Sequence, residues 1–570
     1  MLEVRWGAYS GAGDKAQNQD CHAVAVPDFS ASERQVAIAA VADGISSSQV
    51  SQYASELAIN QFIRDFPLTS ELWSAKRAVQ HVIAAINTRL YVKTQTSAYQ
   101  DNPERGYVCT FSAVIIEGER AVIIHCGDSA IYHIRGNVVT SCTTPHRAET
   151  EFGESVLNNA LGITAAVTAD ISYVDVLAGD YFVLMTDGID EFVSGTDLLR
   201  IFDKQETDLN EVAHSLASLA RTAGSRDNLT ASIIEVVNLN NERKREYTPD
   251  GFLPFFEEPY VGTSIDNWLL ISELSRSERS LVFLARDKTS QEEAVIKLPS
   301  EERQGLEMYL DSIAKEEWLA CLIDSPHVIR SSVSTSGRSA FYTVFDFVNG
   351  PTLRQWFNDH GLLSLQNLRN WSAQIVTGLN AMHRNGILHQ DIRPENIIID
   401  SNGILKIIDL GSASYYDYRF SFAPELPVAE GDLLYCAPEY IVGLYPDERT
   451  DQFSLAVTVY YLLTGHYPYG SRIAQLSQVS DLHRVKYQSA IMYGVKIPLW
   501  VDTALKRACH VKMHKRYSAL SEFLYDLSHP NPSAVRTLPL IEKHPVRVWQ
   551  GISACLLTLL LGVLLWQYGG

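Results

Sequence analysis

The sequence predicts a multidomain α+β protein with a single transmembrane helix near its C-terminus. At 570 residues the chain is too long for one hydrophobic core. Its composition, 46% hydrophobic and 20% charged, is typical of folded protein. A polar stretch at 239–259, interrupted by Pro and Gly, indicates a linker between two large domains. The predicted parts are a domain at 1–238, this linker, a domain at 260–530, a second linker at 531–547 and a helix at 548–568.

The charge and the cysteines exclude some functions. The formal net charge is −20, whereas a surface that binds nucleic acid needs a basic patch, so we expect no nucleic-acid partner. The eight cysteines are scattered and none forms a Cys-x-x-Cys pair, which favours reduced thiols over a disulfide framework or a zinc site. The N-terminus lacks the basic and apolar regions of a signal peptide.

The segment at 548–568 is apolar apart from four residues. About 20 helical residues cross the core of a bilayer, so this length suffices. Trp549 and Trp566 lie near its two ends, as interfacial anchors do. Lys543 and Arg547 precede the segment, so we expect a single-pass anchor in the inner (cytoplasmic) membrane, with both large domains in the cytoplasm. The alternative is a buried C-terminal helix that packs on the second domain.

Four carboxylates of the first domain stand in distinctive settings. Asp43 and Asp187 each follow an apolar, strand-like run and precede Gly, where the backbone turns tightly and exposes the carboxylate. Asp227 leads into another apolar run, and Asp20 closes the polar run that begins at Lys15. Aspartates at strand ends can converge on hard divalent cations. Two such ions, about 4 Å apart, can share a hydroxide that attacks phosphorus.

The order of these motifs over residues 3–238 resembles that of the metal-dependent protein Ser/Thr phosphatases. The matching motifs are Val41-Ala-Asp-Gly44, His125-Cys-Gly-Asp-Ser129, Asn159-Ala-Leu-Gly162, Thr186-Asp-Gly188 and Asp227-Asn-Leu-Thr230. The resemblance implies an α/β/β/α sandwich with two Mn²⁺ or Mg²⁺ ions and positions for a third. The ligands that it implies are Asp20, Asp43, the carbonyl of Gly44, Asp187 and Asp227, with Asp128 and Glu191 for the third ion.

The first domain departs from that family at three places. Lys15 stands where the family often has a phosphate-binding Arg, so it keeps the charge but loses the two-pronged geometry. Gln19 replaces an acidic residue, and Pro145-His146 stands where Asp-His is usual. None of these is an implied metal ligand, so we expect an active phosphatase. Apolar patterns also predict a hairpin at 111–116 and 121–126, and helices at 54–66 and 72–91.

The second domain is organised around residues 388–411. This stretch predicts a loop, a short apolar strand, a turn at 401–403, a second strand and a loop that opens on Asp-Leu-Gly. Asp391, Asn396 and Asp409 fall at fixed offsets within it. Phosphoryl transfer needs such a set, because a carboxylate must orient the attacking hydroxyl while an amide and a second carboxylate hold Mg²⁺ on the phosphates.

The pattern H-x-D-x-x-x-x-N…D-x-G resembles the Hanks-type protein Ser/Thr kinases, from about residue 267 to 527. The resemblance implies a bilobal fold that binds ATP with Mg²⁺. It makes Asp391 the base, and Asn396 and Asp409 the Mg²⁺ ligands. Lys297 matches the lysine that contacts phosphate, and Glu316 on a helix at 308–322 is the best candidate to pair with it, with Glu317 as the alternative. Adenine would bind at a hinge over Asp346–Val348.

The nucleotide loop departs most from the kinase pattern. The three positions where the family has Gly, counted back from Val282, are Ser275, Ser277 and Ser280. Glycine allows close approach to phosphate and positive φ, so we expect serine to weaken nucleotide binding while it adds hydroxyl donors.

The catalytic loop also departs from the kinase pattern. Gln390 replaces the Arg that meets a phosphorylated activation loop, so activity is expected not to depend on that phosphorylation. Arg393 stands where Ser/Thr kinases carry a catalytic Lys, and Asp432 replaces a Thr, so we predict an Arg393–Asp432 ion pair.

The two resemblances together imply a bacterial, membrane-anchored signalling enzyme that phosphorylates Ser and Thr of proteins and also removes such phosphates. Its own kinase domain is then an expected phosphatase target, because tethering gives an effective concentration of about millimolar. One alternative is an active phosphatase regulated by a nucleotide-binding pseudokinase domain, which the serine-substituted loop favours. Another is a scaffold that binds partners through two inactive domains.

Overall fold

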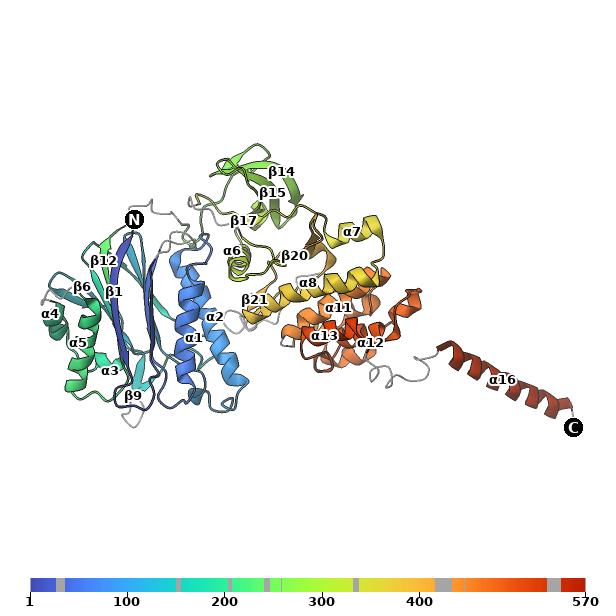
Figure 1. Cartoon of the computed structure of the whole chain (residues 1–570), viewed down its shortest axis with the longest axis horizontal. Helices are drawn as coiled ribbons and strands as arrows, with labels where there is room; N and C mark the ends of the chain where they lie inside the picture. Colours follow the sequence, from blue (N-terminus) through green and yellow to red (C-terminus); the bar gives the residue numbers. More distant parts are fainter. Residues whose placement is uncertain are drawn as a thin grey trace.

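A computed structural model describes residues 2–26, 36–149, 155–202, 208–239, 247–257, 259–331, 338–415, 433–444, 446–530 and 545–568. Figure 1 shows a β-sandwich domain at the N-terminal end, a second domain of two lobes beside it, and a separate C-terminal helix. The multidomain α+β fold predicted from the sequence is therefore confirmed.

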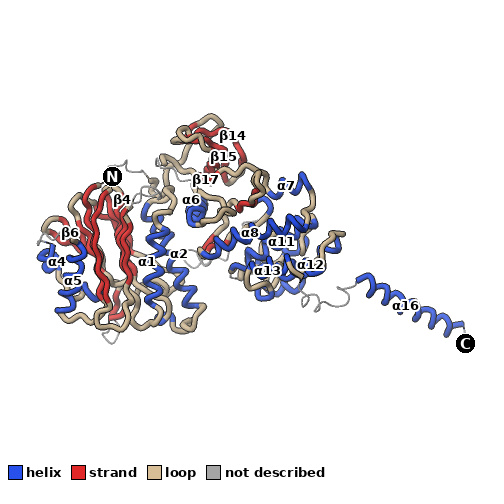
Figure 2. The backbone as a smooth tube through the Cα atoms, viewed as in Figure 1, coloured by secondary structure: helices blue, strands red, loops and turns tan. Residues whose placement is uncertain are grey.

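The first domain is a sandwich of two five-stranded antiparallel sheets between two helical layers (Figure 2). The first sheet has the order β1 (Glu3–Gly11), β12 (Leu229–Asn238), β11 (Tyr181–Met185), β6 (Ala130–Arg135) and β7 (Val138–Ser141). The second has the order β10 (Asp170–Asp175), β5 (Arg120–Cys126), β4 (Phe111–Glu117), β3 (Ala37–Ala42) and β2 (Cys21–Ala25). The predicted hairpin is formed by β4 and β5.

Helices cover both outer faces of this sandwich. Helices α4 (Gly195–Phe202) and α5 (Leu209–Thr222) lie on the first sheet, and α1 (Ser51–Asp65) and α2 (Ala75–Gln95) lie on the second. The remaining elements are α3 (Asp187–Asp190), the 3-10 turn η1 (Pro103–Arg105) and a small hairpin of β8 (Arg147–Glu149) and β9 (Ser155–Leu157).

Strand β3 shows why the sandwich forms. All six of its residues are apolar and buried, since both of its faces are covered. Successive side chains of a strand point to opposite faces. Ala37, Ala39 and Val41 accordingly join the core between the sheets, whereas Ile38, Ala40 and Ala42 join the core beneath α1 and α2.

The second domain has a small sheet-bearing lobe and a larger helical lobe (Figure 1). The sheet order is β13 (Ser264–Ile265), β14 (Trp268–Arg276), β15 (Ser280–Asp287), β16 (Glu293–Pro299) and β17 (Thr343–Asp346), with η2 (Glu301–Arg303) and helix α6 (Glu307–Leu322) beside it. Two short two-stranded sheets follow, formed by β18 (Ile387–Leu388) with β21 (Ser414–Tyr415) and by β19 (Ile397–Ile399) with β20 (Leu405–Ile407).

The helical lobe is built on buried, mostly apolar helices. Its helices are α7 (Leu353–His360), α8 (Leu365–Arg384), α10 (Pro438–Ile441), α11 (Glu448–Thr464), α12 (Leu499–Ala508) and α13 (Leu520–Ser528). Its 3-10 turns are η3 (Pro394–Asn396), η4 (Gly470–Gln475), η5 (Val479–Arg484), η6 (Ala490–Tyr493) and η7 (Met513–Lys515). Helix α11 begins at Glu448, because Asp447 and Thr450 form a capping box at its start.

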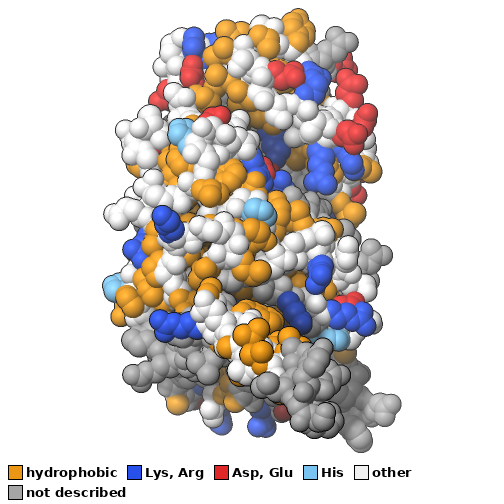
Figure 3. Space-filling model, turned by 90° about the vertical axis from the view of Figure 1, so that its right-hand side faces the viewer, with side chains coloured by type: hydrophobic (Ala, Val, Ile, Leu, Met, Phe, Trp, Pro, Cys, Tyr) orange, Lys and Arg blue, Asp and Glu red, His pale blue; other side chains and the backbone are white. Residues whose placement is uncertain are grey.

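The C-terminal helix α16 runs from Pro545 to Tyr568. Leu556, Leu557 and Leu559 on it are each at least 60% exposed. Figure 3 views the molecule from its C-terminal side and shows hydrophobic side chains interspersed with Lys and Arg. No helix among the residues that the structure describes is long and apolar enough to cross a membrane, so the predicted transmembrane helix at 548–568 is not supported.

The stretch that composition marks as a linker is packed in its described part, 247–257. Phe252 and Leu253 are each 1% exposed. The backbone carbonyl of Gly251 accepts from Ser74 of the first domain, and the carbonyl of Pro254 accepts from Phe341 of the second. The two domains therefore pack on this segment as well as on each other.

Two candidate active sites

The first candidate site lies where strands from both sheets of the sandwich end. Asp43 follows β3, Asp128 lies between β5 and β6, and Asp187 follows β11 at the start of α3. Carboxylate oxygens of these three residues lie within 4.8 Å of one another. Such a cluster of oxygen ligands is the kind that divalent cations bind.

Asp20 lies beside this cluster and shows that the residues fit a cation. Its Oδ2 accepts a hydrogen bond from Thr186 Oγ1 at 2.9 Å. Its Oδ1 is buried and has no hydrogen-bond partner among the residues that the structure describes. Burial raises the pKa of Asp43, and the neighbouring carboxylates of Asp20 and Asp187 raise it further. A positive ion would relieve both the repulsion and the unpaired oxygen.

Two basic side chains form ion pairs with carboxylates of the site. The guanidinium of Arg147 pairs with Asp128 at 2.9 Å, Asp187 at 3.0 Å and Glu191 at 2.9 Å. Lys15 pairs with Asp227. This site therefore brings together the carboxylates of the first domain that the sequence predicted as metal ligands, together with Lys15.

Sequence reasoning missed Arg147. It lies on the short strand β8 within a polar stretch that carries no motif. The local sequence holds no signal that could have identified it, because its role depends on carboxylates from two other parts of the chain, the β5–β6 loop and α3.

Close packing fixes the loop that follows β3. A Cβ on Gly44 would lie 2.9 Å from the Gln19 carbonyl oxygen and from Ser51, so only glycine fits there. Gln19 Nε2 donates to the Ser48 carbonyl at 2.8 Å and to Ser51 Oγ at 2.7 Å. Gln19, which replaces an acidic residue, thereby joins the segment of Asp20 to the start of α1.

The second candidate site lies between the lobes of the second domain. Lys297 Nζ on β16 lies 2.6 Å from Glu316 Oε2 on α6 and 3.6 Å from Asp409 Oδ1. Burial alone would lower the pKa of Lys297, but Glu316 and Asp409 raise it, so the ammonium stays charged. Glu316 is therefore the partner of Lys297. The alternative, Glu317, binds Arg338 instead, at 2.8 Å.

The catalytic loop is held by one buried carboxylate. Asp451 of α11 accepts hydrogen bonds from the backbone N–H groups of His389 at 2.9 Å and Gln390 at 2.8 Å. Asn396 Nδ2 donates to the carboxylate of Asp391 at 2.8 Å and to its carbonyl at 2.9 Å. Gln390 and Asp409 have φ of 69° and 62°, a left-handed conformation that is costly outside glycine and clusters at functional sites.

The nucleotide loop is a tight turn between β14 and β15. Ser277 Oγ accepts from the Arg279 N–H at 3.2 Å and from the Ser280 N–H at 3.0 Å, which closes the turn. Ser275 and Val282 are cross-strand partners at its base. The side chain of Ser277 therefore shapes this loop by bonding to the loop's own backbone.

Two further predictions for the second domain concern Arg393 and the hinge. Arg393 Nε donates to Glu395 Oε2 at 3.0 Å, while Asp432 lies outside the described residues, so the predicted Arg393–Asp432 pair is untested. Asp346 ends β17, where its N–H donates to the Arg330 carbonyl, and Val348 follows it and is buried.

Comparison with known protein families matches each domain separately. The model of the protein phosphatase 2C family matches residues 9–222, and that of the protein kinase domain matches residues 270–527. The chain contains a protein phosphatase 2C domain followed by a protein kinase domain.

Individual relatives cover one domain each. For the kinase domain, a probable serine/threonine-protein kinase (KIN1 homolog) of Enterocytozoon bieneusi is 29% identical over 47% of this chain and 43% of its own length. The serine/threonine-protein kinase PrkC of Bacillus subtilis is 25% identical over 43% of this chain and 38% of its own length. The chain thus spans less than half the length of these curated relatives.

A solved structure matches the phosphatase domain. The catalytic domain of the phosphatase PstP, in complex with two manganese ions, is 24% identical and covers 42% of this chain and all of its own length, with a TM-score of 0.34.

Proposed function

We propose that this protein is a bifunctional signalling enzyme that phosphorylates Ser and Thr of proteins with ATP and hydrolyses phospho-Ser and phospho-Thr. The ion pair between Lys297 and Glu316, with Asp409 beside it, carries the kinase half of the proposal. Such a pair places an ammonium where the phosphates of a nucleotide are bound and activated.

The kinase residues divide the work of phosphoryl transfer. Asp391 orients the substrate hydroxyl and accepts its proton, and the hydrogen bond from Asn396 holds its carboxylate in place. Lys297 contacts phosphate oxygens. The oxygens of Asn396 and Asp409 would hold Mg²⁺, which would neutralise charge on the phosphates.

The phosphatase residues form a carboxylate-lined centre suited to Mn²⁺ or Mg²⁺. Asp20, Asp43, Asp187 and Asp227, with the carbonyl of Gly44, would hold the metal, which supplies a hydroxide at neutral pH when bound. The pairing of Lys15 with Asp227 keeps its ammonium at the edge of the centre, where it can bind a phosphate oxygen of the substrate. Proteins that bear phospho-Ser or phospho-Thr are the proposed substrates, and the kinase domain of the chain itself is one of them.

A second candidate function is a phosphatase whose kinase domain binds nucleotide without catalysis. The observation that favours it is the nucleotide loop, where Ser277 hydrogen-bonds within the loop instead of leaving a glycine-lined space for phosphate.

Label transfer from γ-labelled ATP distinguishes an active kinase domain from one that binds nucleotide without catalysis. The protein would carry Asp187→Asn, because an active phosphatase could remove the label. We expect label on this protein and on a basic model substrate in the presence of Mg²⁺. We expect no label with the double variant that carries both Asp187→Asn and Asp391→Asn. Absence of label from folded protein would refute the kinase half. The phosphatase half is tested by Mn²⁺-dependent hydrolysis of an aryl phosphate by the protein with Asp187 intact, and absence of hydrolysis would refute it.

A further inference from the structure

The phosphatase domain packs on the helix of the kinase domain that carries Glu316. Asp311 of α6 accepts hydrogen bonds from two residues of the phosphatase domain, Trp73 Nε1 at 2.8 Å and Arg77 Nε at 2.7 Å. His81 Nε2 lies 3.1 Å from the same carboxylate. These three residues lie just before and within the first turns of α2. One carboxylate of α6 thus organises a polar contact with the other domain.

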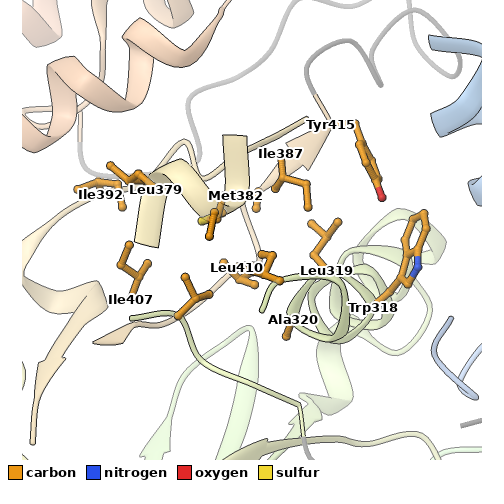
Figure 4. Packing of buried hydrophobic residues seen from close by; sticks show 14 of the residues in the cluster. Trp318, Leu319, Ala320, Leu379, Met382, Ile387, Ile392, Ile407, Leu410 and Tyr415 are labelled. Atoms are coloured by element: carbon orange, nitrogen blue, oxygen red, sulfur yellow. The ribbon is translucent and has the colours of Figure 1, made fainter. Parts of the chain in front are cut away.

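Trp318 forms the apolar centre of the contact. It is fully buried, its ring lies edge-on to that of Trp73 at 5.9 Å, and its Nε1 donates to the carbonyl of Asp65 at the end of α1. On its other side Trp318 lies 5.6 Å from the ring of Tyr415, which directly precedes the undescribed residues 416–432. Figure 4 shows Tyr415 facing Trp318 on α6. A side chain of this size is costly to expose to water. Burial of Trp318 therefore opposes separation of the domains, in addition to the polar contacts.

The neighbouring Glu317 is a buried carboxylate that both domains satisfy. It accepts from Ser70 Oγ of the phosphatase domain at 2.6 Å, from Arg338 Nη1 at 2.8 Å and from the backbone N–H of Val344 at 3.1 Å. A buried charge is costly to leave with fewer partners, so Ser70 contributes to holding α6 in this position.

The contact continues beyond α6. Phe252 lies beneath the guanidinium of Arg77 at 4.2 Å and against Phe341 of the kinase domain at 5.8 Å. Near the other end of α2, a cavity of about 530 Å³ is lined by Val92 and Thr96 on one side and by residues 446–449 and Ser518 of the helical lobe on the other. Helix α2 therefore faces both lobes of the kinase domain.

The geometry of α6 couples this contact to the kinase site. With about 3.6 residues per turn, Glu316 and Trp318 project roughly 200° apart around the helix. Glu316 reaches Lys297 on one side, while Trp318 packs on the phosphatase domain on the other. A rotation or outward shift of α6 would therefore disturb both contacts together.

We propose that the phosphatase domain is the activating partner of the kinase domain, because its docking fixes α6 where Glu316 pairs with Lys297. The proposal rests on the kinase activity proposed above. It assigns to the phosphatase domain a second role that does not depend on its metal centre.

The test uses the full chain with Asp187→Asn as parent. Arg77→Glu places a negative charge against Asp311, and Ser70→Asp places one against Glu317. The matched control is Arg200→Glu, because Arg200 lies on α4, is 72% exposed and pairs with Asp197 of its own helix. Each interface variant is also made with Asp187 intact, and its phosphatase activity on an aryl phosphate shows that the phosphatase domain is folded.

We expect both interface variants to lose at least tenfold in kinase kcat/KM for ATP while they keep phosphatase activity, and the Arg200→Glu control to match the parent. Amide hydrogen exchange of α6 should become faster in the two variants. Unchanged or increased kinase activity in both variants would overturn the proposal. If the parent itself transfers no label, the proposed kinase function has failed. Amide hydrogen exchange of α6 then tests the docking role separately, and unchanged exchange in Arg77→Glu would overturn that role.

Discussion

The charge pair between Asp311 and Arg77 should supply a measurable part of the energy that joins the two domains. Burial alone would raise the pKa of Asp311, but hydrogen bonds and charge from Arg77 and His81 outweigh it and lower the pKa from 3.8 to about 2. One pKa unit is worth about 1.4 kcal/mol, so the charged form is stabilised by about 2 kcal/mol in the folded protein. The Asp311 side chain is 23% exposed, so solvent screening is limited.

A double-mutant cycle at pH 7 isolates this energy. The variants are Asp311→Asn, Arg77→Gln and their combination, and urea unfolding is followed by the fluorescence of tryptophan, since Trp73 and Trp318 lie at the interface. We expect a coupling free energy of up to about 2 kcal/mol, because Arg77 shares the pKa shift of Asp311 with His81. A coupling below about 0.5 kcal/mol would refute the reasoning, because that is the value of an exposed, screened pair.

The stabilisation that Asp311 provides should decrease as the pH falls. The folded pKa of Asp311 is lower than its unfolded value, so the stabilisation is fully present above about pH 4 and is lost as pH falls toward 2. Asp311→Asn should lack this component of acid sensitivity. An equal loss of stability in parent and variant over that range would contradict the assignment.

Three further predictions concern the sites and the kinase core. Arg147→Ala should lower the Mn²⁺ concentration for half-maximal phosphatase activity, because its guanidinium competes for the Asp187 carboxylate, and a higher requirement would contradict this. Lys297→Met should reduce label transfer at least 100-fold and leave aryl phosphate hydrolysis unchanged, whereas retained transfer would rule out its phosphate-binding role. Arg516→Ala should destabilise the kinase domain by about 3–5 kcal/mol in urea unfolding, since it leaves the buried Glu439 without its cation, and a loss below about 1 kcal/mol would contradict that view.

Local patterns allowed much of both sites to be anticipated. Asp43 and Asp187 stand directly after apolar strands, and strand ends of a sandwich meet at one edge, so their convergence follows from sequence spacing. Asp391 and Asn396 are five residues apart in one loop, so their contact is also local.

The contacts that the sequence did not reveal join distant parts of the chain. Arg147 acquires its role from carboxylates far from it in sequence, and nothing in its neighbours indicates them. Trp318 lies in the α6 segment, where an apolar residue predicts only a buried face and not which domain covers it. The linker assignment at 239–259 rested on polarity and did not anticipate that Phe252 would be buried between two domains.

The presence of both domains in one chain, packed on one shared segment, also fixes their proportion. Two opposing enzymes made as separate proteins vary independently in copy number, so the phosphorylated fraction of a common substrate varies with expression. In this chain each kinase domain is accompanied by one phosphatase domain, and the interface through Trp318 keeps them together. At steady state the phosphorylated fraction of a common substrate would then depend on the ratio of two intrinsic rates, and it would not change with the amount of protein in the cell.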